Sequence, residues 1–179
     1  MSRKPSPGSL GRKMPSSGRL SERRPDSPHI PGDLWRRVDR AGDLYRASTV
    51  DRVQIVKRGL PARYTKVLAN GMYISKEKLY TTVGLVRATV DRKVRADQRL
   101  NQDESERVMG IARLVGQAQS MVEESGGGAD FDAAKWLAEW LDQPLPALGG
   151  RRPGEFMDTA EGRGLVSDLL AQQQSGAYA

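Results

Sequence analysis

The stretch "SKEKLYTTVGLVRATVDRKVRAD" (residues 75–97) contains two short helical segments separated by one glycine. Ser75 is placed to cap the first segment, and Gly84 is placed to end it. The second segment restarts at once, and the pair offers six apolar residues for its inner faces: Leu79, Val83, Leu85, Val86, Val90 and Val94. Two short helices hinged at a glycine are typical of a helix-turn-helix, but they also fit an αα-hairpin in a purely structural bundle.

The outward positions of the second segment favour DNA binding. Arginine can contact guanine edges or phosphates, and threonine can contact a thymine methyl group. Two features argue against a strong DNA reader: Val86 stands where a capping Ser or Thr is expected, and the carboxylate of Asp91 repels phosphates. The candidate DNA-binding residues are Arg87, Thr89, Arg92, Lys93 and Arg95.

The charge is distributed unevenly along the chain. The net charge of +7 divides into +5 for residues 1–32, +1 for 33–49, +8 for 50–100 and −7 for 101–179. A basic region attracts a polyanion whatever its sequence, and an acidic region does not. Charged helix faces can also be merely solvated, but so large a reversal favours two regions with different partners.

Composition excludes several classes of protein. The 179 residues are 37% hydrophobic, and no apolar run approaches the roughly 20 residues of a membrane span. Cysteine is absent, and the only histidine, His29, lies in a Pro/Ser/Gly-rich stretch, so we expect no cysteine nucleophile, catalytic triad or metal site. The N-terminus lacks the apolar stretch of a secretory signal. We therefore expect a soluble, cytoplasmic protein that is not an enzyme and needs no cofactor.

The fold class follows from apolar periodicity. Residues 1–32 contain six of the ten prolines and few apolar residues, which predicts a disordered basic tail. From residue 33 onward the pattern is helical and no useful alternating run appears, so the chain is predicted to be all-α. Residues 33–100 are expected to form the helix-turn-helix region, in which Gly71 is placed just after the end of the helix in "LPARYTKVLANG" (residues 60–71).

A longer helix is predicted over residues 101–125. Asn101 and Glu104 have the spacing of a capping box, and five small or branched apolar residues then recur at steps of three and four: Val108, Ile111, Val115, Ala118 and Val122. Such a stripe is either core only or core together with a dimer seam, and the sequence leaves both open.

Residues 126–179 form the last predicted unit. Trp136 and Trp140 share one face of a helix, and "LPALGGRRPGEFMDT" (residues 145–159) then makes a stiff, kinked passage to a final helix. Gly162 and Gly164 lie in the first turns of that helix, where each costs about 1 kcal/mol relative to alanine.

This C-terminal stretch resembles the toxin-binding domain of the Xre/MbcA/ParS antitoxins. The matching positions are Trp136, Trp140, Pro146, Ala147, Leu148, Gly149, Gly150, Arg151, Pro153, Asp158, Thr159, Gly176, Tyr178 and Ala179. Upstream, the chain from "GLPARY" (residues 59–64) to "DESERVMGIARL" (residues 103–114) is similar to the Xre-like DNA-binding half of the same family.

The resemblance implies an antitoxin that inhibits a RES-domain toxin acting on NAD. In this family the last helix and the C-terminal residues block the active site of the toxin, and the helical half commonly binds operator DNA of its own operon. The toxin-binding residues implied here are Trp136, Trp140, Leu148, Gly149, Gly150, Arg151, Pro153, Leu169, Gly176, Tyr178 and Ala179. The expected partners are the cognate RES-domain toxin, operator DNA and a second copy of the chain in a homodimer.

A second interpretation remains open. The chain can instead be a free-standing helix-turn-helix transcriptional regulator whose acidic half serves oligomerisation or an unrelated partner. The carboxylates lie at predicted caps and solvated faces, and no base, nucleophile or metal ligands converge, so an enzyme is the least favoured class.

Overall fold

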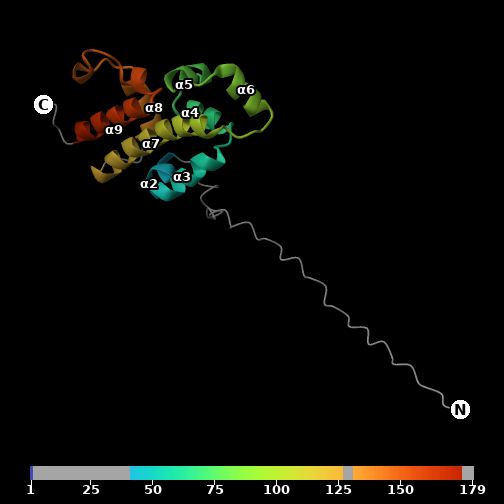
Figure 1. The fold of residues 1–179 in the computed structure, drawn as a ribbon. Coiled ribbons are helices and arrows are strands. Elements are labelled where there is room, and N and C mark those ends of the chain that lie inside the picture. Colours follow the sequence, from blue (N-terminus) through green and yellow to red (C-terminus); the bar gives the residue numbers. More distant parts are fainter. Residues whose placement is uncertain (2–40, 127–130, 175–179) are drawn as a thin grey trace.

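Helices make up the regular structure in the part of the chain that the computed structural model describes, which is Met1 and residues 41–126 and 131–174 (Figure 1). No strand occurs within these residues, so the all-α prediction is confirmed for them. The predicted tail, residues 1–32, lies outside them apart from Met1. The α-helices are α2 Ala41–Arg46, α3 Thr49–Arg58, α4 Tyr64–Gly71, α5 Lys76–Thr82, α6 Arg87–Arg95, α7 Gln102–Glu124, α8 Ala133–Leu141 and α9 Ala160–Gln174, and the 3-10 helices are η1 Pro146–Leu148 and η2 Pro153–Phe156.

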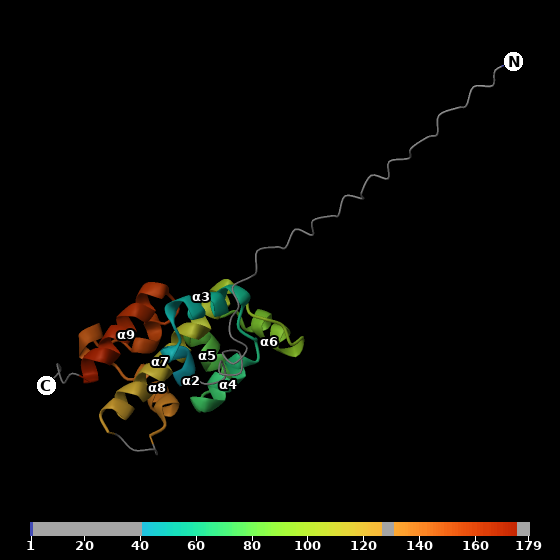
Figure 2. The same ribbon diagram turned by 90° about the horizontal axis from the view of Figure 1, so that it is seen from below.

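The long helix α7 runs through the middle of the molecule and contacts α2, α3, α8 and α9 (Figures 1 and 2). Its start is fixed by the predicted capping box, because the Asn101 side chain accepts a hydrogen bond from the Glu104 backbone and the Glu104 carboxylate accepts one from the Asn101 backbone, both at 2.8 Å. The predicted apolar stripe is buried from Val108 to Ala118, and Val122 is half-buried. The stripe is therefore core within one chain.

Helix α2 approaches α7 closely at Gly116. A Cβ atom on Gly116 would lie 2.5 Å from Tyr45 Cβ and 2.6 Å from the Ala41 carbonyl oxygen, so only glycine fits there. Leu44 of α2 is fully buried against this part of the core.

Helix α4 ends differently from the prediction. Gly71 is the last residue of the helix, and Tyr73 takes the left-handed conformation with φ of 56°. The backbone N–H groups of Met72 and Ile74 donate to the carbonyl oxygens of Leu68 and Ala69, at 2.9 and 3.0 Å. The predicted position of Gly71 just beyond the helix was wrong, because these bonds carry the helix past it.

The helix-turn-helix is built as predicted from α5 and α6. Ser75 accepts a hydrogen bond from the Lys78 backbone N–H at 3.1 Å, and Gly84 makes the turn with φ of 68°. Five of the six expected inner residues are buried or packed against the core, but Val86 is 68% exposed. The inward placement of Val86 was wrong, since it occupies the N-cap of α6 with an extended backbone and no side-chain cap.

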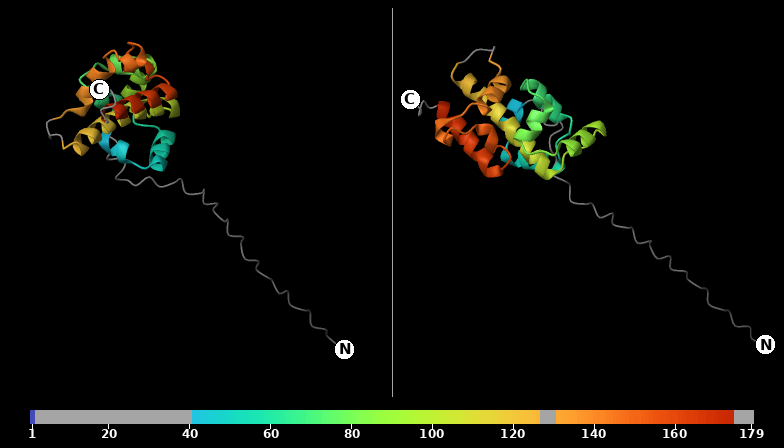
Figure 3. Two further views of the ribbon diagram at one scale, coloured as in Figure 1. Left: turned by 90° about the vertical axis from the view of Figure 1, so that its left-hand side faces the viewer. Right: turned by 90° about the horizontal axis from the view of Figure 1, so that it is seen from above.

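The C-terminal elements fold back onto α7. Helix α9 lies alongside α7, as the left view of Figure 3 shows, and it also packs on η2. The close approach explains Gly162, where a Cβ atom would lie 1.9 Å from the Phe156 carbonyl oxygen. Gly164 has no atom within 4 Å of such a position, so packing in the described residues does not require glycine there.

Candidate functional site

The outer face of α6 presents two arginines to solvent. Arg92 and Arg95 are exposed, and among the described residues neither side chain has a hydrogen bond or ion pair. Arg87 is also exposed, but its guanidinium contacts Glu77 at 3.0 Å and Asp91 at 3.6 Å. Within the part of the chain that the structure describes, the face therefore offers two guanidinium groups without a partner and a third held by carboxylates.

The other two candidates on α6 are placed differently. The Lys93 ammonium forms an ion pair with Glu104 of α7, and the side chains are only 14% and 11% exposed. Thr89 is half-buried. Lys93 thus ties α6 to the start of α7, which the sequence pattern of α6 alone did not indicate.

The negative charge of Asp91 is balanced by cationic side chains within the helix-turn-helix. Its Oδ1 accepts a hydrogen bond from Lys76 Nζ at 2.8 Å and one from the Tyr80 hydroxyl at 3.4 Å. The hydrogen bond from Lys76, together with the nearby positive charge of Lys76 and Arg87, lowers the pKa of Asp91 below its ordinary value. The positive charges of Lys76 and Arg87 therefore reduce the predicted repulsion between the Asp91 carboxylate and phosphates.

In the C-terminal half, several implied toxin-binding residues are parts of the core. Trp140 is 3% exposed and Leu169 is 6% exposed. Trp136 is half-buried, and its ring stacks on that of Trp140 with centroids 6.1 Å apart. Trp140 and Leu169 thus belong to the core of the C-terminal unit, whereas part of the Trp136 side chain is accessible to solvent.

The passage between α8 and α9 forms a projecting turn. Gly149 and Gly150 have φ values of 64° and 83°, and a Cβ atom at either would meet nothing within 4 Å. Glycine is therefore needed there for the backbone conformation and not for space. The Leu145 backbone N–H donates to the Arg151 carbonyl oxygen at 3.0 Å and closes the turn.

Three further implied residues flank this turn. Leu148 is half-buried in η1, and Pro153 is buried at the first position of η2. Arg151 lies 4.4 Å from the centre of the Phe156 ring and pairs with Glu155 at 3.1 Å, which leaves its exposed guanidinium held in place. Gly176, Tyr178 and Ala179 lie outside the described residues.

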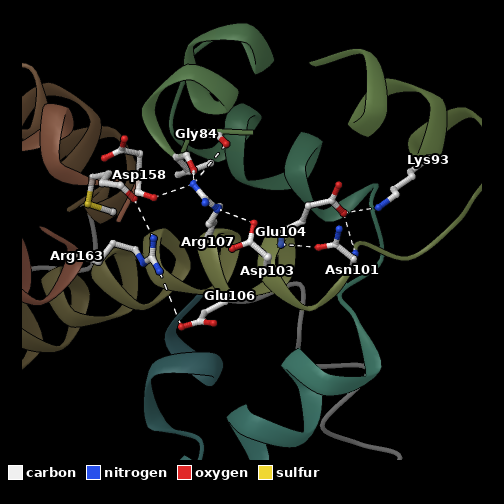
Figure 4. Close-up of polar contacts among 11 residues, drawn as sticks. Gly84, Lys93, Asn101, Asp103, Glu104, Glu106, Arg107, Asp158 and Arg163 are labelled. Carbon is white, nitrogen blue, oxygen red and sulfur yellow. Dashed lines mark hydrogen bonds and ion pairs between the residues drawn. The ribbon is translucent and has the colours of Figure 1, made fainter. Parts of the chain in front are cut away.

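A polar junction joins the two halves along α7 (Figure 4). Arg107 Nη1 donates to the carbonyl oxygens of Val83, Gly84 and Asp158 at 3.4, 3.5 and 2.7 Å. Its Nε donates to Asp103 at 2.9 Å. One side chain thus contacts the turn of the helix-turn-helix and the backbone two residues before α9.

Arg163 completes the junction from α9. Its Nη1 donates to the Met157 carbonyl oxygen at 3.2 Å, and its Nη2 lies 4.0 Å from Glu106. The aliphatic part crosses Gly110, where a Cβ atom would lie 2.3 Å from Arg163 Cδ. Burial lowers the pKa of Arg163, although a guanidinium stays charged at neutral pH. Sequence patterns do not single out Arg107 or Arg163, because their partners across the junction, Asp158 and Glu106, are distant in the chain.

The described residues hold no group of three or more His, Cys, Asp or Glu side chains arranged to bind a metal ion. Within the same residues, no helix has both the length and the apolar character needed to cross a bilayer.

Comparison with known proteins agrees with this arrangement. Residues 51–113 match the antitoxin Xre-like helix-turn-helix domain, and residues 121–176 match the antitoxin Xre/MbcA/ParS C-terminal toxin-binding domain. The Prs ADP-ribosylating antitoxin of Sphingobium sp. (strain YBL2) is 48% identical over 136 residues, which cover 76% of this chain and 86% of the relative. An antitoxin Xre of Yersinia enterocolitica is 29% identical over 145 residues, covering 81% and 90% of the two chains.

A third relative, an antitoxin Xre of Photorhabdus laumondii, is 24% identical over 122 residues, which are 68% of this chain and 77% of the relative. The chain therefore belongs to the Xre family of antitoxins, and it combines a helix-turn-helix domain with a toxin-binding domain. Of the two interpretations open from sequence, this membership favours the antitoxin.

Proposed function

We propose that this antitoxin inhibits a RES-domain toxin that consumes NAD, and that it represses its own operon. The observation that carries the proposal is the match of residues 121–176 to a toxin-binding domain on a chain that also has the helix-turn-helix domain. The chain acts by binding in this proposal and catalyses no reaction.

The relative from Sphingobium supports a toxin with NAD chemistry. Its name associates it with ADP-ribosylation, and ADP-ribosyl groups are taken from NAD. The resemblance of the C-terminal stretch to antitoxins of RES-domain toxins points to the same substrate.

Inhibition is proposed to come from the C-terminal residues. Helix α9 ends at Gln174, at the opposite end of the molecule from α6 (Figures 1 and 2). A segment that follows α9 can therefore enter a cleft of the toxin while α6 remains free. Tyr178 is the anchor in this proposal, since tyrosine buries a large ring and keeps a polar group for hydrogen bonding.

Operator binding is proposed to use α6 as the recognition helix. The exposed Arg92 and Arg95 support direct contacts with DNA, and Arg87 can join them if it exchanges Glu77 or Asp91 for a phosphate. A homodimer is proposed because helix-turn-helix proteins read paired half-sites as dimers. Residues 33–100, 101–125 and 126–179 are proposed as the DNA-binding, connecting and toxin-binding regions, with 1–32 as a basic tail.

The test is a titration of the purified RES-domain toxin with this protein while NAD loss is followed. A stoichiometric stop in NAD loss is expected. Undiminished NAD loss at excess antitoxin, with a control antitoxin of the family still inhibiting its own toxin, would refute the proposed target. Binding of the promoter region of the operon is measured in parallel by fluorescence anisotropy, with random DNA of equal length as the control.

A further inference from the structure

Tyr73 has a backbone conformation that its side chain does not favour. It follows α4 with φ of 56°, and the Ile74 N–H donates across it to the Ala69 carbonyl oxygen at 3.0 Å. Helix ends of this type strongly favour glycine, because a Cβ atom in the left-handed region clashes with the backbone. A glycine is available two residues earlier, at Gly71, yet the left-handed position carries the tyrosine.

Packing within the described residues does not offset the energetic cost of the left-handed backbone at Tyr73. The Tyr73 side chain is 74% exposed, so its ring contributes little to the core. Asp97, the other non-glycine residue with a left-handed backbone among those described, is different, because aspartate tolerates this region and Asp97 forms an ion pair with Arg63 at 3.2 Å. A strained, exposed aromatic residue is more often found where a partner binds.

Tyr73 lies beside the start of the toxin-binding domain. Helices α4 and α8 are in contact, and Lys135 Nζ of α8 lies 6.0 Å from the centre of the Tyr73 ring. On the same end of α8, the Phe131 ring lies 6.0 Å from the Trp136 ring, and Phe131 is 36% exposed. We call Tyr73, Phe131, Lys135 and Trp136 the aromatic patch.

The composition of the aromatic patch fits a protein partner. Accessible aromatic rings supply large contact area at a small entropic cost, and they are enriched among the residues that dominate interfaces. DNA is disfavoured because residues 101–179, which contain three members of the patch, carry a net charge of −7. Lys135 adds one positive charge, which suits a carboxylate on the partner.

We propose that the toxin bound by residues 121–176 extends over α8 onto Tyr73, so that its interface includes both domains of the antitoxin. Three members of the patch fall within the matched toxin-binding range. Tyr73 falls within the helix-turn-helix range, and its ring adjoins Lys135. The Tyr73 ring enters an apolar pocket of the toxin, and Lys135 pairs with an acidic side chain there. This inference rests on the proposed function.

The test uses Tyr73→Gly in the full chain. Glycine removes the ring and relieves the left-handed backbone, so the melting temperature is expected to stay equal or rise while affinity for the RES-domain toxin falls at least about tenfold. Asp97→Gly is the matched control, because it makes the same backbone change away from the patch and is expected to bind as wild type. Lys135→Glu is a second variant, expected to weaken binding without changing the fold.

Each other outcome has a definite meaning. If Tyr73→Gly and Lys135→Glu both bind the toxin as tightly as wild type, the patch lies outside the interface and the inference is overturned. A change from dimer to monomer in sedimentation at unchanged toxin affinity overturns it as well, in favour of a second copy of the chain. If the wild-type protein itself fails to bind the toxin, the proposed function is overturned, and the inference that rests on it is overturned with it.

Discussion

Arg107 on α7 and Asp158 before α9 are joined by a hydrogen bond of 2.7 Å from Nη1 to the backbone carbonyl oxygen (Figure 4). The same nitrogen contacts the carbonyl oxygens of Val83 and Gly84, so one guanidinium links the turn of the helix-turn-helix to the toxin-binding domain. The contact also leaves little room for a side chain at Gly84, because a Cβ atom there would lie 2.7 Å from Arg107 Nη1 and 3.0 Å from Asp158 Cβ.

Arg107→Ala is expected to lower the free energy of unfolding by about 2 kcal/mol, since several carbonyl oxygens lose a charged donor. Urea denaturation measures this. Arg113→Ala is the control, because Arg113 is exposed on the same helix and is expected to change stability little. Equal stability of the two variants would mean that the junction contributes nothing to the fold.

The two glycines at the start of α9 are expected to respond in opposite directions to alanine. Gly162→Ala places a Cβ atom 1.9 Å from the Phe156 carbonyl oxygen and should destabilise the protein by about 2 kcal/mol or more. Gly164→Ala meets nothing within 4 Å and should stabilise it by about 0.5–1 kcal/mol. Thermal unfolding of both variants checks this pair, and a stabilising Gly162→Ala would show that α9 does not pack on η2 as described.

Asp91 makes stability depend on acid pH. Its pKa in the folded protein is lowered from the ordinary value of 3.8, chiefly by the hydrogen bond from Lys76, so the unfolded chain takes up the proton first as the pH falls. The contribution is present above about pH 4 and is lost as the pH falls through the folded-state pKa. As the pH falls from about 5 to about 2, the free energy of unfolding should therefore decrease less for Asp91→Asn than for the wild type. Urea denaturation at each pH measures this. Parallel pH profiles would exclude Asp91 as the cause.

Arg92→Ala and Arg95→Ala are expected to weaken binding to the operator by about 1–3 kcal/mol for each base contact that is lost. Random DNA of the same length should be affected less, and anisotropy titrations at one salt concentration measure both. If the two DNAs lose affinity equally, these arginines contact phosphates only, and the specificity lies elsewhere.

Local sequence rules predicted the features that depend on neighbouring residues. The caps at Ser75 and Asn101, the turn at Gly84 and the buried stripe of α7 each follow from spacing within a few residues. The family resemblance of the C-terminal stretch was equally specific, since it rests on many ordered positions, and the matches to family models confirm it.

Features that depend on distant residues were not predicted. Lys93, which the helix pattern places among the candidate DNA contacts, forms an ion pair with Glu104 of α7, and the contacts of Arg107 span up to 51 positions. The left-handed Tyr73 was missed for another reason: propensity assigns that conformation to Gly71, and the hydrogen bonds of α4 override it.

We propose that residues 176–179 are the inhibitory element of the antitoxin. The most direct measurement compares NAD loss by the RES-domain toxin in the presence of the full chain and of a chain that ends at Ser175, with circular dichroism to confirm equal helical content. We expect full inhibition by the first protein and none by the second, together with loss of growth rescue. Full inhibition by the shortened chain would contradict it and would assign inhibition to the surface of residues 131–174.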